Sequence, residues 1–169
     1  MSKNVTLYIV RHAKAADRGP KYPDDSVRPL VKAGRRQALD LARLLEKMDV
    51  SLGRVGSSPY TRALETAEPL KTRLPKGQGI ETLEPLANGD HDRLLTLLNE
   101  TYEDTMSAAL VGHKPFVGEL ASYLLTGNSG VMDIAFKKAM VMVLAGGLEP
   151  GRMRLTMALP PKLYRPFVS

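Results

Sequence analysis

Two side chains that can handle phosphate directly follow the first apolar segment of the chain. Residues 5–10, Val-Thr-Leu-Tyr-Ile-Val, are rich in β-branched and aromatic residues, which is typical of a buried strand. Arg11 and His12 come next. A histidine can attack a phosphorus centre and carry the phosphoryl group covalently, and an arginine can donate two hydrogen bonds to phosphate oxygens at once. The pair suggests phosphoryl chemistry, with a surface turn carrying a chance basic pair as the alternative.

A second histidine and a second arginine occupy comparable positions further along the chain. His113 directly follows the predicted buried strand 107–112, and Arg62 comes shortly after the predicted short strand 53–57. In open α/β sheets, ligands bind at the carboxyl ends of the strands. We therefore expect these two side chains and the Arg11-His12 pair to converge on one anion-sized site at that edge of a sheet.

The elements that must position these side chains alternate between strands and helices. Apolar residues recur at helical spacing over 33–48 and 115–125, so each of these segments would bury one face. The alternation predicts an α/β fold, a three-layer α/β/α sandwich with a mainly parallel sheet, in one domain over residues 1–169. Strands are predicted at 5–10, 53–57, near 80, at 107–112, 139–145 and 153–158, the last two pairing antiparallel. Helices are predicted at 33–48, from 58 onward with a kink or restart at Pro69, at 91–102 and at 115–125. Segment 84–90 is predicted as a loop, and the Pro-rich tail is assigned neither helix nor strand.

The composition is that of an ordinary globular protein with an excess of positive charge. Of the 169 residues, 43% are hydrophobic and 25% are charged, and the formal net charge is +6. The basic residues are dispersed and there is no Trp, which favours an anionic substrate over nucleic acid as the partner. The lack of cysteine excludes disulfides and a cysteine nucleophile and agrees with a cytoplasmic location. Residues 1–4 lead into the first strand and no apolar segment reaches membrane-spanning length, so we expect neither a signal peptide nor a membrane partner.

Each candidate side chain also has a purely structural interpretation. The alternatives are pairing of Arg11 with Asp17 or Asp25, pairing of Arg62 with Glu65 or Glu68, and a turn role for His113. Four coinciding strand ends are harder to attribute to chance. Metal ligation is the other chemical interpretation of two histidines, but no histidine pair has helical metal-ligand spacing, so we expect no metal and no cofactor. The third histidine, His91, begins a predicted helix and is expected to be solvated.

Four blocks of sequence carry a family resemblance. They are Arg11-His12-Ala13, residues 58–67 (Ser-Pro-Tyr-Thr-Arg-Ala-Leu-Glu-Thr-Ala), Gly112-His113 before an apolar helix, and residues 25–30 (Asp-Ser-Val-Arg-Pro-Leu) with Gly34 beyond. The first three resemble the Arg-His-Gly signature, the second-arginine helix and the second-histidine block of the histidine phosphatase superfamily, which also contains the cofactor-dependent phosphoglycerate mutases. The fourth resembles the small bacterial phosphohistidine phosphatases of that superfamily. Together the blocks span residue 5 to about residue 125.

The resemblance implies a minimal form of the phosphoglycerate mutase-like fold and a role for each side chain. His12 would be the nucleophile and form a phosphohistidine, and Arg11, Arg62 and His113 would stabilise the charge on the transferring phosphoryl group. Arg28 matches an arginine of the small phosphatases and would assist substrate binding. Its alternative is an ion pair with Asp24 or Asp25.

This chain departs from the family pattern in two ways. Ala13 replaces the usual glycine, and alanine resists a positive φ. Larger members carry an acidic residue in the middle of the chain that protonates the leaving oxygen. The candidates for such a general acid here are Glu81, Glu84 and Asp90, and none of them matches the family firmly. Helix-capping or surface roles are their alternative.

The expected function is that of a metal-independent phosphatase that works through a phosphohistidine intermediate on His12. The resemblance favours a phosphohistidine-bearing protein as the substrate. A phosphatase of small phosphate esters is one alternative, and a non-catalytic phosphate-binding or interaction module is another. A mutase is disfavoured because the chain lacks the sequence for the large insertions with which mutases retain their intermediate.

Overall fold

A six-stranded mixed sheet forms the centre of the molecule. The computed structural model describes residues 4–102 and 104–168. The expectation about a signal peptide concerns mainly residues 1–3, which lie outside the described residues. The strand order is β3-β2-β4-β1-β5-β6. The first four of these pair in parallel, whereas β5 is antiparallel to both β1 and β6. The strands are β1 (Val5–Arg11), β2 (Arg54–Ser57), β3 (Glu81–Thr82), β4 (Ser107–Gly112), β5 (Val141–Gly146) and β6 (Met153–Leu159).

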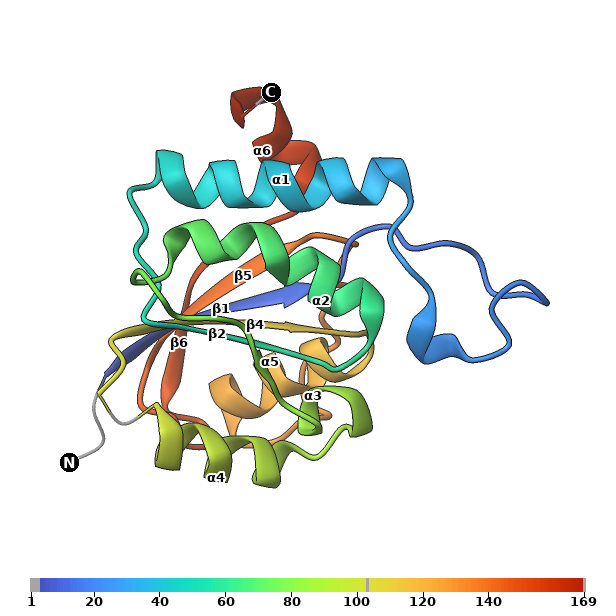
Figure 1. Ribbon diagram of the computed structural model, residues 1–169. Coiled ribbons are helices and arrows are strands. Elements are labelled where there is room, and N and C mark those ends of the chain that lie inside the picture. Colours follow the sequence, from blue (N-terminus) through green and yellow to red (C-terminus); the bar gives the residue numbers. More distant parts are fainter. Residues whose placement is uncertain (1–3, 103, 169) are drawn as a thin grey trace.

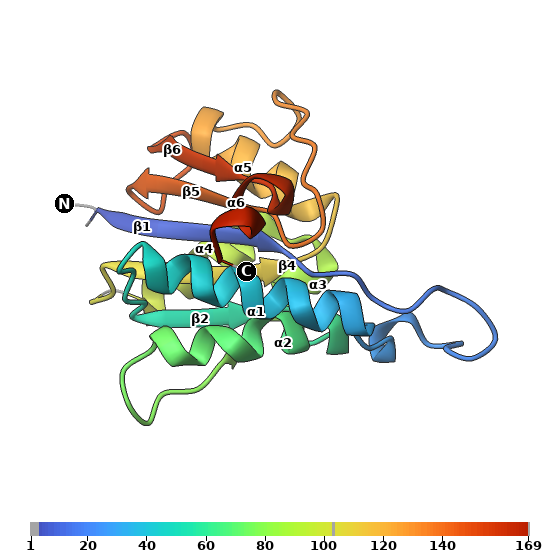
Figure 2. The same cartoon turned by 90° about the horizontal axis from the view of Figure 1, so that it is seen from above.

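Helices cover both faces of this sheet, which confirms the predicted three-layer α/β/α sandwich (Figures 1 and 2). The central strands are apolar on both faces, as parallel strands buried between two helical layers must be. Alternate residues of β1 therefore enter two different cores: Leu7 and Ile9 join the core under α4 and α5, and Tyr8 and Val10 join the core under α1 and α2. The helices are α1 (Lys32–Lys47), α2 (Thr61–Ala67), α3 (Pro85–Asn88), α4 (His91–Thr101), α5 (Phe116–Thr126) and α6 (Pro161–Val168), with 3-10 turns η1 (Asp25–Val27) and η2 (Glu68–Arg73).

Several local predictions need correction. The Pro-rich tail forms α6, because Pro161 suits a first helical turn and the buried Tyr164 and Val168 pack toward α1. The segment 84–90 contains the short helix α3. The helix predicted from residue 58 begins at Thr61 and tightens into η2 at Pro69, where the kink was expected.

His91 is not solvated as the sequence suggested. Its side chain is only 18% exposed and lies between two aromatic rings, with ring centroids 4.5 Å from Phe116 and 5.5 Å from Tyr123. Burial lowers the pKa of His91. This histidine therefore joins α4 to α5 and belongs to the packing of the helical layer.

A close backbone approach at Gly34 fixes α1 against the segment that follows β1. A Cβ atom at this position would overlap the carbonyl oxygen of Lys14. Glycine to alanine in a helix normally adds about 1 kcal/mol of stability. We expect Gly34→Ala instead to destabilise the fold by about 1–3 kcal/mol, because the backbone must move apart. Urea unfolding of this variant and of the control Gly79→Ala, whose Cβ would meet nothing within 4 Å, measures the difference. Equal effects of the two substitutions would contradict the close-approach argument.

Within the described ranges, no helix combines the length and the apolar character needed for a membrane span.

Candidate active site

The four predicted side chains gather at the carboxyl-terminal edge of the parallel strands. Arg11 is the last residue of β1 and His12 follows it, while His113 follows β4. Arg11 lies opposite Gly112 in the parallel register, and the His12 backbone N–H donates to the Gly112 carbonyl over 2.9 Å. This register places the two imidazoles side by side, with ring centroids 5.1 Å apart. Burial lowers the pKa of both histidines, and the positive charges of Arg11 and of Arg62, which lies in the first turn of α2, lower it further.

His12 is held as a neutral imidazole with a defined tautomer. Its Nδ1 lies 2.7 Å from the Ala13 carbonyl oxygen. A carbonyl can only accept, so Nδ1 carries the proton and Nε2 keeps its lone pair. Burial, together with the charges of His113, Arg62 and Arg11, lowers the pKa of His12 to about 3. At neutral pH, Nε2 is therefore an unprotonated nucleophile.

The depressed pKa of His12 predicts a loss of stability in acid. In the unfolded chain the pKa of this imidazole is the ordinary 6.5, whereas in the folded chain it is about 3. Its contribution to stability is therefore complete above pH 6.5 and falls as the pH drops toward 3. Between pH 7 and pH 5 the wild type should lose about 2 kcal/mol more than His12→Asn. Urea unfolding at both pH values measures this, and identical losses in the two proteins would contradict a buried neutral His12.

The two arginines are fixed by their terminal nitrogens. Arg11 Nη1 donates to the Phe136 carbonyl oxygen over 2.7 Å. Arg62 donates from Nη1 to the backbone oxygen of Asp25 over 2.6 Å and from Nη2 to the carboxylate over 2.7 Å. In both arginines the Nε–H is buried and has no hydrogen-bond partner among the described residues. Each guanidinium is thus oriented by the protein and retains a donor.

His113 is held in place by contacts with Ser58 and Tyr60. Its Nε2 lies 2.7 Å from the Ser58 hydroxyl, and its ring lies 4.9 Å from the Tyr60 ring. The Tyr60 ring in turn faces the Arg62 guanidinium at 5.0 Å. Burial and the charge of Arg62 lower the pKa of His113 to about 4. Its buried Nδ1, like the two arginine Nε atoms, has no partner within the described part of the chain.

Buried polar nitrogens without partners are costly, about 1–3 kcal/mol each, and native proteins rarely keep them without a reason. Here three of them belong to two cationic side chains and a histidine around one nucleophile. The oxygens of an anion can accept from both arginine Nε–H groups, and from His113 Nδ1 when that nitrogen carries the ring proton. The arrangement is therefore suited to binding a phosphoryl group beside His12 Nε2.

Asp25 organises the arginines, a role that the sequence did not reveal. Its carboxylate pairs with Arg62, with Arg28 Nε at 2.8 Å and with Arg18 Nε at 2.9 Å. Burial acts to raise the pKa of Asp25, but the hydrogen bonds from Arg28 and Arg62 outweigh it and lower the pKa to about 2. Arg28 also donates to the Ala16 carbonyl oxygen. The expected alternative for Arg28, a pair with Asp25, is therefore present, and the shared carboxylate also places Arg28 beside Arg62.

The candidate general acids lie in different settings. Glu81 pairs with Arg54 at 2.6 Å, and Asp90 caps α4 by accepting from the Arg93 backbone N–H. Glu84 is exposed and occupies the N-cap position of α3. No contact joins any of the three to His12 within the described residues. The capping and surface interpretations thus describe Glu81 and Asp90 well.

The alanine that replaces the usual glycine is compatible with this backbone. Among the described non-glycine residues, only Asp49 and Ala139 have a positive φ, so Ala13 does not need one. The Ala13 backbone N–H donates to the Thr66 hydroxyl over 3.0 Å, and its carbonyl orients His12. The Ser58 hydroxyl, just before α2, accepts from the Tyr60 backbone N–H and contacts His113.

The described residues contain no group of three or more His, Asp or Glu side chains close enough to hold a metal ion.

A family model supports the class that this fold and site define. The histidine phosphatase superfamily (branch 1) model matches residues 7–119. The chain therefore belongs to the histidine phosphatase superfamily, and its enzyme class is that of a phosphatase.

Its relatives include small bacterial proteins of similar length. Phosphohistidine phosphatase SixA of Escherichia coli (strain K12) is 32% identical over 128 residues, which cover 75% of this chain and 78% of SixA. An uncharacterised protein of Picosynechococcus sp. (strain PCC 7002) is 34% identical over 145 residues, covering 83% of this chain and 85% of that protein. The solved structure of the protein histidine phosphatase SixA complexed with tungstate superposes with a TM-score of 0.80 at 28% identity, covering 94% of this chain and 98% of that one.

Proposed function

We propose that this protein is a phosphohistidine phosphatase that works without a metal through a phosphoenzyme on His12. The observation that carries the proposal is the contact of His12 Nδ1 with the Ala13 carbonyl, which leaves Nε2 unprotonated, in a site where three buried nitrogens lack partners among the described residues. A binding module has no use for an unprotonated nucleophile at the centre of its anion site. The similarity to SixA supports phosphohistidine as the substrate class.

In the proposed first step, the His12 Nε2 lone pair attacks the phosphorus of the bound phosphohistidine. A new N–P bond forms, the N–P bond of the substrate breaks, and the departing imidazole takes up a proton. Arg11, Arg62 and His113 bind the phosphoryl oxygens and stabilise their charge in the transition state. A water molecule then attacks the phosphorus on His12, which releases phosphate and restores the imidazole.

Arg28 is proposed as a further substrate-binding residue, because Asp25 holds it beside Arg62. We propose that residues 1–169 act as one catalytic domain. The cytoplasmic location and the independence from metal and cofactor remain predictions. Chelator treatment tests the last of these: full activity is expected afterwards, and a loss that zinc restores would contradict it.

A crystal structure with tungstate tests the assignment of the site. We expect the oxyanion within hydrogen-bond distance of Arg11, Arg62 and His113, with its metal centre facing His12 Nε2. An oxyanion bound elsewhere, with these groups unoccupied at saturating concentration, would contradict the assignment. Pre-steady-state kinetics with an aryl phosphate separate an enzyme from a binding module, because only the enzyme gives a burst and turnover.

A further inference from the structure

Three segments that meet beside His12 carry only positive charge. Residues 11–15, 31–39 and 134–140 together contain seven Lys and Arg residues and no Asp or Glu. Two of the seven have other roles, since Arg11 belongs to the candidate site and Arg36 pairs with the buried Asp40. The other five are exposed and are called the basic flank from here on: Lys14, Lys32, Arg35, Lys137 and Lys138.

The three segments are held together by specific contacts. A small core cluster joins Ala13 and Ala15 to Ala38 and Ala139. The Lys14 backbone N–H donates to the Gln37 side chain over 2.9 Å, and the Ala139 N–H donates to the carbonyl oxygens of Arg11 and His12. The basic flank is therefore a fixed surface attached to the nucleophile, and its charges come together through the fold.

The four lysines of the flank have no carboxylate partner among the described residues. Arg35 donates to the Leu30 carbonyl oxygen, which leaves its charge unneutralised. Five exposed, uncompensated cations on three segments that contact one another create a positive potential that attracts and orients anionic partners.

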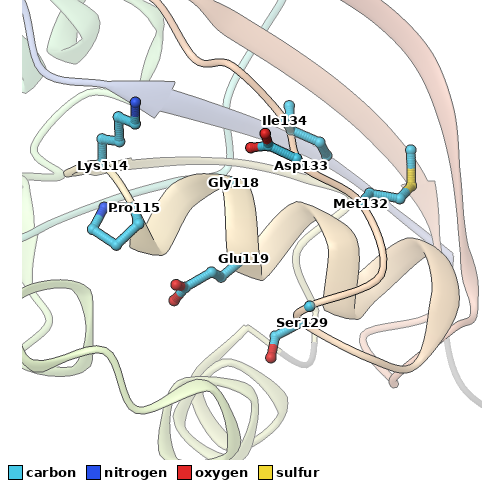
Figure 3. A pocket seen from close by; sticks show the side chains of 9 residues that line it. Lys114, Pro115, Gly118, Glu119, Ser129, Met132, Asp133 and Ile134 are labelled. Atoms are coloured by element: carbon cyan, nitrogen blue, oxygen red, sulfur yellow. The ribbon is translucent and has the colours of Figure 1, made fainter.

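The other side of the site has the opposite character. A cavity of about 270 Å³ adjoins His113, and its wall includes Lys114 together with the carboxylates of Glu119 and Asp133 (Figure 3). Glu119 belongs to α5, on the face of the sheet opposite to α1, and Glu84, Asp90 and Asp92 lie on the neighbouring elements. Carboxylates therefore lie beside the site next to α5, whereas the three segments that carry the basic flank contain none.

We propose that the basic flank is a docking surface for the acidic face of a phosphorylated protein, an inference that rests on the proposed phosphohistidine phosphatase function. Lys14 is two residues beyond His12 and the flank continues over the first turns of α1, so only a ligand much larger than a phosphate group reaches it. The only aromatic residue of the three segments, Phe136, is buried, so the flank offers no stacking platform for nucleic acid bases.

The experiment uses two phosphohistidine peptides of equal length, one with aspartates and one with asparagines around the phosphohistidine, together with free phosphohistidine. The flank variant is Lys137→Glu/Lys138→Glu. The control, Lys76→Glu/Arg154→Glu, makes the same charge change at the amino-terminal edge of the sheet. Arg154 lines a hollow there with Val5, and Pro75, which precedes Lys76, lines another with Gly53. Hydrolysis is measured for each protein, and peptide affinity is measured in the His12→Ala background, where binding does not depend on turnover.

We expect the wild type and the control to prefer the aspartate peptide about tenfold or more at low ionic strength. Both should lose much of this preference in about 0.5 M salt, because salt screens interactions between exposed charges. The flank variant should lose the preference in kcat/KM and in affinity, while its kcat/KM for free phosphohistidine changes less than about twofold.

No preference in the wild type, or an equal loss in the control, would overturn the docking surface. A flank variant that loses binding to poly(U) RNA or to anionic vesicles while its peptide preference is intact would also overturn it. If no substrate is hydrolysed but the affinity preference follows the flank, the docking surface stands and the proposed function fails.

Discussion

Replacing His12 by alanine is expected to lower kcat for phosphohistidine and for aryl phosphates by at least about 10⁴-fold, the scale seen when a covalent nucleophile is removed. The physical reason is that the Nδ1 contact with Ala13 leaves the lone pair of His12 on Nε2, whereas the Nε2 of His113 is engaged by the Ser58 hydroxyl. Phosphate binding should persist in part, because Arg11 and Arg62 remain oriented by Phe136 and Asp25. Single-turnover kinetics and phosphate titration of the folded variant measure the two effects separately.

His113→Ala provides the contrast within the same site. It removes a phosphate ligand and leaves the nucleophile, so the reaction should be strongly slowed while a phosphoenzyme on His12 still forms. Circular dichroism and thermal unfolding establish that both variants are folded. Undiminished turnover in His12→Ala would eliminate the covalent mechanism.

A large preference for phosphohistidine over alkyl phosphate monoesters is the second expected result. An alkoxide is a poor leaving group unless an acid protonates it in the transition state, and general acids supply about 10²–10⁴-fold. The imidazole of phosphohistidine is easily protonated near neutral pH and needs less help. Among the described residues, Glu81 pairs with Arg54, Asp90 caps α4, and the arginines around Asp25 hold its pKa down to about 2, so none of these three is placed to donate a proton beside His12. We expect kcat/KM to differ by about 10²-fold or more, with aryl phosphates intermediate.

The amide variants of Glu81, Glu84 and Asp90 are the controls for this preference. Each single change should cost less than about threefold on phosphohistidine, and Asn at position 90 should still cap α4, because asparagine caps helices as well as aspartate does. Comparable efficiency on an alkyl monoester, collapsing when one of these carboxylates becomes an amide, would refute the argument. It would also identify the missing acid.

The sequence located the four central side chains because each follows a strongly patterned element. β4 runs from Ser107 to Gly112 as predicted, and the end of a buried parallel strand is a position that local pattern can identify. Once β1 and β4 are neighbours in register, His12 and His113 must lie together. The convergence of these side chains follows from the order of the parallel strands, so it could be predicted without any knowledge of side-chain contacts.

The supporting contacts were harder to predict because they join residues far apart in the chain. Asp25 was considered as a partner of Arg28 and Arg11, but its pair with Arg62 is 37 residues distant and depends on how η1 folds over α2. The anchoring of Arg11 by Phe136 spans 125 residues. The Pro-rich tail was assigned neither helix nor strand, whereas burial of Tyr164 and the hydrogen bond from its hydroxyl to the Ala139 carbonyl favour a helix.

Trapping of the phosphoenzyme is the most direct test of whether His12 carries the phosphoryl group during turnover. The wild type is mixed with excess phosphohistidine peptide, quenched in alkali because phosphohistidine is labile in acid, and digested for mass spectrometry. The covalent mechanism predicts one phosphorylated peptide, modified on His12, that forms and decays fast enough to carry the steady-state turnover. Turnover without any phosphorylated histidine, or phosphorylation at His113 or His91 in place of His12, would contradict it.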